Sequence, residues 1–372
     1  MRLIVPMLLL MLLPAWPAAA RTKLVALPER ETTVVRLDNP TATLVEEERV
    51  LALEAGENQV DFSWQGVRID ADSIRLAVLD RSAGVQLLAV AYPPGEEALV
   101  WTLQAQRAGE VKVRISYLLA ALDRLVTYQA VTDSEESHLD LQAFLVLRNF
   151  SGEDFAAAGF QLGQGSAATL PLAHEETRRQ ALFSAKGVPV VKTFTWDSVA
   201  QPWDPKRDGL TVGIPVHYRV ANTAAANLGQ APLWGGKVRV FQVDGHGGTI
   251  YLGEDQGEFT PVGEDLKLYV GDSRDVAVTQ HKVREEVVNP RPSRALMVLH
   301  DTEEELAATV ENFKERAVTL DLVEHIDGEW EVREVSHPYE RYDAGTLIVH
   351  VPLAAGATEQ VKIHYQRRNV RN

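Results

Sequence analysis

The sequence predicts an all-β protein with little helix, built as two or three antiparallel, immunoglobulin-like β-sandwich domains in tandem. The first observation is a period-two alternation of apolar and polar residues, as in EVKVRISY at 110–117. Such alternation lets one face of a strand enter a core while the other face meets water. The second is the pair of Asp-Gly steps at 244–245 and 327–328, which separate strand-like runs and suit hairpin turns. The third is the scarcity of convincing helical patterns.

The alternating segments recur along the chain, at 72–80, 98–104, 110–117, 138–148, 236–243, 317–325, 346–351 and 359–366. Residues 301–313 allow a helix, because Thr302 and Glu305 imitate a capping box. We predict instead a strand that ends at Asn312, since β patterns flank this segment on both sides. Glu46-Glu47-Glu48 reads as a solvated strand segment that discourages edge pairing.

A break in the alternation near 105–111 marks one domain boundary, and a second irregular zone at 197–211 is rich in turn formers. The predicted domains are an N-terminal β domain at 22–110, a central β domain at 111–280 and a C-terminal immunoglobulin-like sandwich at 281–372.

The first twenty residues are typical of a signal peptide. Arg2 precedes the apolar run LIVPMLLLMLLPAW, and Ala18 and Ala20 fit the small-residue pattern before a cleavage site. We expect cleavage after Ala20. The chain has no cysteine, so the lipid-carrying cysteine of a bacterial lipoprotein is missing, and no later stretch is apolar enough to span a membrane. The predicted location is periplasmic or secreted.

Charge excludes nucleic acid as a partner. Removing residues 1–20 takes one arginine from the 37 basic residues and leaves 52 acidic ones, a net charge of −16. Phosphate binding needs a basic stripe, which this balance does not favour.

Gly271-Asp272-Ser273 is the tripeptide that carries the nucleophile in one class of lipases and esterases. That chemistry needs a tight strand-to-helix turn, an oxyanion hole and a histidine base. The residues from Val276 onward read as a strand, and Asp321 to His325 is one residue too long for the Asp-x-x-His of those enzymes. We therefore predict that the tripeptide is the turn that ends a strand, and we assign no catalytic residue.

Histidines concentrate after residue 280, at His281, His300, His325, His337, His350 and His364. A zinc site needs three or four of them at one point, and the sequence has neither H-x-H nor H-E-x-x-H. His350 and His364 could be neighbours on adjacent strands, with His325 joining them. The stretches GEDQGE and DGHGG lack the oxygen spacing of a calcium loop. We predict no metal and no cofactor.

Three tryptophans give the binding hypothesis. Trp196 and Trp203 flank the irregular zone, and Trp234 precedes Gly235-Gly236. Tryptophans on loops can form platforms for sugars or peptides, and more often they cover a small core. We predict a binding patch at these three residues.

Two blocks resemble a known family. Residues 114–162 hold Ser-Tyr, a second Tyr, a strand and then Gly-Glu-Asp. Residues 236–276 hold a Gly-Lys-Val-Arg-Val strand, a hairpin, Gly-Glu-Asp, Thr-Pro, Gly-Glu and a further strand that ends near Gly and Asp-Val. Together with the N- and C-terminal stretches, this order resembles the domain of unknown function 4139, found in bacterial mucoidy-inhibitor-like (MuiA-like) proteins.

The resemblance implies β-sandwich domains and no established catalytic residue. Two features depart from the family: no segment has the length of its helical hairpin insertion, and Phe259 stands where relatives often carry a histidine before Thr-Pro.

We expect from these observations a non-enzymatic extracytoplasmic module that binds or scaffolds an envelope protein or glycan. Two alternatives stay open. One is a hydrolase of envelope polymers or esters that uses Ser273 or a histidine-bound metal. The other is a structural protein that associates with itself through sheet edges.

Overall fold

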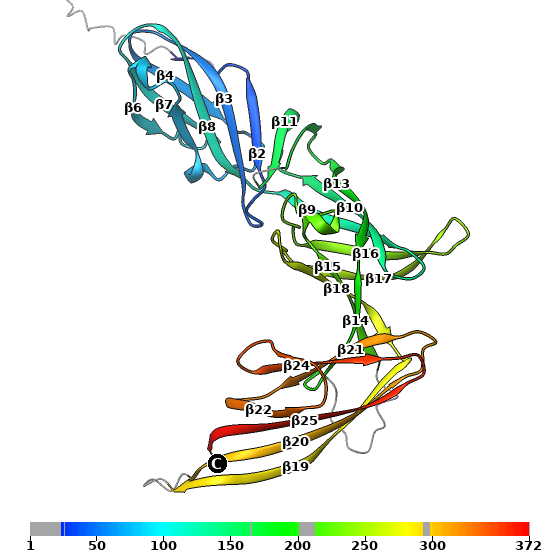
Figure 1. The fold of residues 1–372 in the computed structure, drawn as a ribbon. Helices are drawn as coiled ribbons and strands as arrows, with labels where there is room; N and C mark the ends of the chain where they lie inside the picture. The colour runs from blue at the N-terminus through cyan, green and yellow to red at the C-terminus, as the bar shows by residue number, and fades with distance from the viewer. Residues whose placement is uncertain (1–23, 26, 164–165, 201–212, 293–297, 372) are drawn as a thin grey trace, which may run out of the picture. The chain divides into compact units, whose positions relative to one another are not determined.

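The computed structural model describes residues 24–25, 27–163, 166–200, 213–292 and 298–371. Strands dominate this part of the chain, in several mostly antiparallel sheets, and helix is limited to short 3-10 turns (Figure 1). The all-β prediction is confirmed. The predicted signal peptide and Trp203 lie outside the described residues. None of the described helices is long and apolar enough to cross a membrane.

The chain divides into two compact units, 1–124 with 147–178, and 125–146 with 179–372. The three-domain limits drawn from the sequence stay a prediction.

The first unit contains two sheets. A four-stranded sheet has the order β1-β4-β7-β6, and a six-stranded sheet has the order β12-β11-β2-β3-β8-β5. Their strands are β1 (Leu24–Val25), β2 (Thr32–Arg36), β3 (Thr43–Leu53), β4 (Gly56–Ser63), β5 (Arg75–Val78), β6 (Val85–Ala91), β7 (Ala98–Ala105), β8 (Gly109–Leu119), β11 (Phe155–Leu162) and β12 (Ser166–Leu172). Short 3-10 turns lie at η1 (Ala71–Ser73) and η2 (Arg81–Ala83).

Aromatic rings join the two sheets of this unit. Phe62 on β4 lies 5.5 Å from Trp101 on β7 and 6.0 Å from Tyr117 on β8, measured between ring centroids. All three side chains are buried. Because β4 and β7 belong to one sheet and β8 to the other, these contacts form the centre of a sandwich core, where each buried ring stabilises the fold by about 2 kcal/mol.

The acidic run on β3 differs from its prediction. Glu47 is fully buried, and its carboxylate pairs with Arg30 and Arg49. Glu46 and Glu48 face the other side of the strand and pair with Arg36 and Arg114. The period of two therefore carries the middle glutamate inward, where two guanidinium groups compensate its charge.

The second unit contains three sheets, with the orders β13-β10-β9-β16-β17, β18-β15-β14-β21-β24-β23 and β19-β20-β25-β22. Their strands are β9 (Leu122–Thr132), β10 (His138–Asn149), β13 (Thr177–Pro189), β14 (Val191–Asp197), β15 (Ile214–Ala221), β16 (Gly236–Val243), β17 (Thr249–Gly257), β18 (Asp265–Ser273), β19 (Val276–Pro292), β20 (Val298–Asn312), β21 (Val318–His325), β22 (Glu329–Val335), β23 (Tyr339–Arg341), β24 (Thr346–Leu353) and β25 (Thr358–Arg371). A 3-10 turn, η4 (Ala224–Ala226), follows β15.

The segment that allowed either a helix or a strand is a strand. It forms the C-terminal part of β20, which ends at Asn312 as predicted and pairs with β19 and β25. Thr302 does not cap a helix: its hydroxyl donates a hydrogen bond to the Glu304 carboxylate within the strand (3.0 Å).

Candidate binding groove

A groove of about 550 Å³ lies on the second unit, where β15, the end of β17 and the start of β18 come together. Ligand pockets commonly have a volume in this range. Its walls are formed by His217, Asp255, Gln256, Glu258, Phe259, Thr260, Pro261, Glu264, Asp265, Leu266 and Lys267.

The loop between β17 and β18 is held in place by one buried asparagine. The side-chain amide of Asn222 donates to the carbonyl oxygens of Thr260 (3.2 Å) and Pro261 (3.1 Å), and its backbone N–H donates to Glu264 (2.8 Å). Thr260 also exchanges two backbone hydrogen bonds with Leu233. Because Asn222 is fully buried, these bonds form away from water and fix the wall of the groove.

Phe259 gives the groove an aromatic wall. Its side chain is 52 % exposed, and its ring packs edge-on against Trp234 with the centroids 5.3 Å apart. The carbonyl oxygen of Trp234 accepts a hydrogen bond from the Tyr128 hydroxyl (2.7 Å), which anchors the supporting residue to β9. An exposed ring on a fixed support is a stacking surface that costs little ordering when a ligand binds.

His217 gives the groove a neutral polar group. Its ring packs 5.8 Å from that of Tyr269, and Nδ1 lies 3.4 Å from the Thr195 hydroxyl. Burial, with a smaller effect from the Lys267 ammonium, lowers the pKa of His217 to about 4. The imidazole is therefore uncharged at neutral pH, with one nitrogen able to donate and the other to accept.

Carboxylates make the groove acceptor-rich and negative. Asp255, Glu258, Glu264 and Asp265 line it, against the single ammonium of Lys267. Asp255 is positioned by the backbone N–H of Tyr269, which donates to Oδ2 (2.7 Å). An anionic ligand meets net repulsion here, whereas hydroxyl, amide or ammonium donors find acceptors.

The three tryptophans predicted as a patch have separate positions. Trp234 supports the groove from behind Phe259. Trp196 lies on β14 opposite Leu322 of β21, and Trp203 lies outside the described residues. A binding patch that uses all three stays a prediction. Sequence reasoning missed Phe259 as a site residue, and its one sign was that the predicted resemblance would place a histidine at this position.

Gly271-Asp272-Ser273 is not a turn. The tripeptide forms the last three residues of β18 and pairs with β15, Ser273 opposite Ile214. Gly271 has a φ of 129°, beside a β-bulge, so the strand continues where a larger residue would be strained. The Ser273 hydroxyl accepts a hydrogen bond from the N–H of Asp275 (3.3 Å), and β19 begins at Val276 as predicted.

The late histidines pair with separate carboxylates. His350 contacts Asp321 (2.8 Å), and His364 contacts Glu303 (2.7 Å). The arrangement considered for His350 and His364, as neighbours on adjacent strands, does not occur, because β24 and β25 belong to different sheets. Among the residues that the structure describes, no three or more of histidine, aspartate and glutamate are placed to hold a metal ion.

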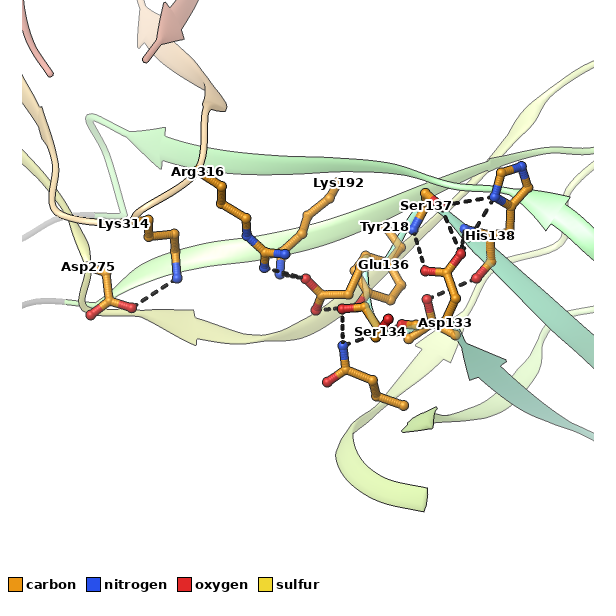
Figure 2. A network of polar contacts seen from close by, with 12 residues as sticks. Asp133, Ser134, Glu136, Ser137, His138, Lys192, Tyr218, Asp275, Lys314 and Arg316 are labelled. Atoms are coloured by element: carbon orange, nitrogen blue, oxygen red, sulfur yellow. Dashed lines mark hydrogen bonds and ion pairs between the residues drawn. The ribbon is translucent and has the colours of Figure 1, made fainter. Parts of the chain in front are cut away.

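A second polar cluster surrounds Glu136 in the turn between β9 and β10. Figure 2 shows its carboxylate facing Lys192, Tyr218 and Arg316. It accepts hydrogen bonds from the Tyr218 hydroxyl (2.8 Å), Arg316 (2.7 Å) and Lys192. Burial opposes ionisation, but these donors, Lys192 foremost, hold the pKa of Glu136 below its usual value.

This cluster has a structural role. A groove of about 540 Å³ beside it is lined in part by Lys192 and Arg316, but both cations already pair with Glu136. Nearby Lys314 pairs with Asp275 (2.9 Å). The network ties the β9–β10 turn to β14, β15 and the segment before β21, and it leaves little positive charge for a ligand (Figure 2).

Comparison with known proteins adds no assignment. No protein-family model matches the chain, and no curated protein is significantly similar to it. The resemblance to the MuiA-like family stays a prediction.

Proposed function

We propose that this chain is a non-enzymatic, extracytoplasmic binding module of the MuiA-like type, which holds an uncharged saccharide of the bacterial envelope in the groove beside Phe259. The observation that carries the proposal is the half-exposed Phe259 ring, supported by Trp234, next to the neutral His217 and a row of carboxylates. The family and the envelope location rest on the order of the sequence blocks and on the signal-peptide pattern.

A saccharide fits this combination of groups. The C–H face of a sugar ring packs on an aromatic face, and its hydroxyls donate to carboxylate oxygens. A peptide anchored by a buried apolar side chain would use a deep apolar pocket, whereas this groove is lined mainly by polar and charged residues. Acidic polymers are disfavoured by the four carboxylates in the wall.

Calorimetric titration of the mature chain with three short oligosaccharides tests the proposal. The probes are neutral N-acetylglucosamine oligomers, cationic glucosamine oligomers and anionic galacturonate oligomers. We expect the neutral oligomer to bind, the cationic one to bind as well because the groove is negative, the anionic one not to bind, and Phe259→Ala to weaken binding of the neutral oligomer about tenfold or more.

The matched control is Phe313→Ala. Phe313 is 57 % exposed and lies outside the groove lining, so its removal leaves affinity unchanged. Equal loss in both variants, or preferential binding of the anionic oligomer, contradicts the proposal.

A further inference from the structure

The edge strand β6 of the first unit has an open, uncharged edge that the proposed saccharide groove does not use. It is the terminal strand of the sheet β1-β4-β7-β6, and β7 is its one strand neighbour among the described residues. Its outer backbone N–H and C=O groups therefore lie along an open edge, which is a template for pairing with another strand.

The side chains of β6 do not protect this edge. The strand reads VQLLAVA, with no charged residue, glycine or proline, and Tyr92 follows it. Apolar side chains are exposed on it and on the residues that flank it in sequence. They are Leu79, Leu87, Leu88, Val90 and Tyr92, each between 38 % and 53 % exposed. A bulge at Leu88 adds an exposed apolar side chain and no charge.

Other edge strands of the chain carry the devices that block pairing. β19 contains Lys282, Arg284, Glu285 and Glu286, and β13 contains Arg178, Arg179 and Lys186. β12, also uncharged, contains Pro171, which cannot donate to a ladder. β6 differs from these strands in having none of the charges or prolines that prevent association.

The two ends of β6 differ in charge. Val85 pairs with Ala105, so Arg107 lies beyond the N-terminal end of β6, near Asp80, which balances its charge. Ala91 pairs with Val100, so Glu96 and Glu97 lie beyond the C-terminal end. Antiparallel pairing of two copies sets the acidic end of one strand beside the end of the other that carries Arg107, whereas parallel pairing sets four glutamates together.

We propose that β6 is the surface through which two copies of this chain associate, edge to edge and antiparallel, forming a continuous sheet across the dimer. A second copy fits because an uncharged strand meets its own copy without repulsion, in a chain whose overall charge is −15. The apolar side chains exposed in the single chain become cross-strand pairs, Leu88 lying near the two-fold axis.

Sedimentation velocity of the mature chain over roughly 1–100 μM tests the association. We expect a concentration-dependent dimer, which Leu88→Lys converts to monomer at every concentration while the circular dichroism spectrum stays that of the unaltered chain. The matched control is Val283→Lys, a 60 % exposed apolar residue on the charged edge strand β19, which leaves the dimer intact. A monomer throughout in the unaltered chain, or a dimer lost only in the Val283 variant, overturns the proposal.

Two further variants test the orientation. Arg107→Glu and Glu96→Arg each weaken the dimer, and their combination restores it, because the two positions face one another between copies. The chain lacks cysteine, so Leu88→Cys gives a clean crosslinking probe. Antiparallel pairing brings the two introduced thiols within disulfide reach. A crosslink at Val283→Cys but not at Leu88→Cys, or no rescue in the charge swap, contradicts this arrangement.

Discussion

The ring of Phe259 packs edge-on against Trp234, with an interplanar angle of 67°, and still exposes half of its surface. This contact couples a residue of the β17–β18 loop to one that precedes β16. A double-mutant cycle with Phe259→Ala and Trp234→Ala, measured by urea unfolding, is expected to give a coupling free energy of about 1 kcal/mol. Additive effects would show that the two rings do not support one another.

Asn222 is expected to control the loop that forms the groove wall. Asn222→Ala removes the amide that bridges the carbonyls of Thr260 and Pro261 and leaves them only their backbone donors, Leu233 and Glu264, so the free energy of unfolding falls by about 2 kcal/mol. Amide exchange in 258–264 accelerates in the same variant. Asn39→Ala is the control, because Asn39 closes only an exposed turn with Thr41 (2.8 Å), and its loss costs less than about 1 kcal/mol.

Glu136 is expected to stabilise the second unit in its ionised form. Glu136→Gln leaves the half-exposed Arg316 and the more buried Lys192 without a full counter-charge, and lowers the free energy of unfolding by about 2 kcal/mol at pH 7. Because the folded pKa of Glu136 is depressed, its contribution is present above about pH 4.5 and is lost as the pH falls through the folded pKa. The difference between the unaltered chain and the variant therefore shrinks on acidification.

A matched control for Glu136 is Asp275→Asn. Asp275 is largely exposed in its pair with Lys314, so the change costs less than about 0.5 kcal/mol. A larger loss for Asp275→Asn than for Glu136→Gln would contradict the structural role of the buried carboxylate.

Glu324 is expected to give the opposite pH dependence. Burial between the C-terminal sheets raises its pKa to about 7, and its Oε1 accepts from Gln280 (2.5 Å). A raised folded pKa contributes stability that is fully present below the ordinary value of 4.5 and is lost as the pH rises through about 7. Urea unfolding of Glu324→Gln at pH 5 and pH 8 removes this slope, on the order of 2 kcal/mol, and an unchanged slope contradicts it.

The mature N-terminus is expected at Arg21. N-terminal sequencing of protein recovered from the native host then begins with the residues RTKLV, since cleavage follows Ala20. A sequence that starts at Met1, or recovery in the cytoplasmic fraction, contradicts the extracytoplasmic location.

The local pattern was enough to predict several of the strands, among them β8 and β10. Period-two burial in these two strands follows the apolar alternation directly, because one face of each strand enters a core. The alternation led to a wrong prediction where a charged residue lies on the buried face of a strand. Glu47 reads as solvated, yet it points inward because it shares the parity of Val45 and Arg49, and two arginines from different segments compensate it.

The groove was beyond the reach of sequence patterns because it depends on loop closure. Asn222 and Thr260 are far apart in the chain and carry no periodic signal, and their hydrogen bonds place Phe259 beside Trp234. The turn predicted at Gly271 is wrong for another reason: a glycine with a positive φ occurs in β-bulges as well as in turns. The partition of His350 and His364 between two sheets is likewise invisible to local alternation.

Amide hydrogen exchange of the mature chain, with and without saturating N-acetylglucosamine oligomer, locates the saccharide on the protein. We expect slower exchange confined to the groove, at 255–267 and around His217, and no such change in Phe259→Ala. Protection centred outside this groove, or protection that persists in Phe259→Ala, would contradict the proposal.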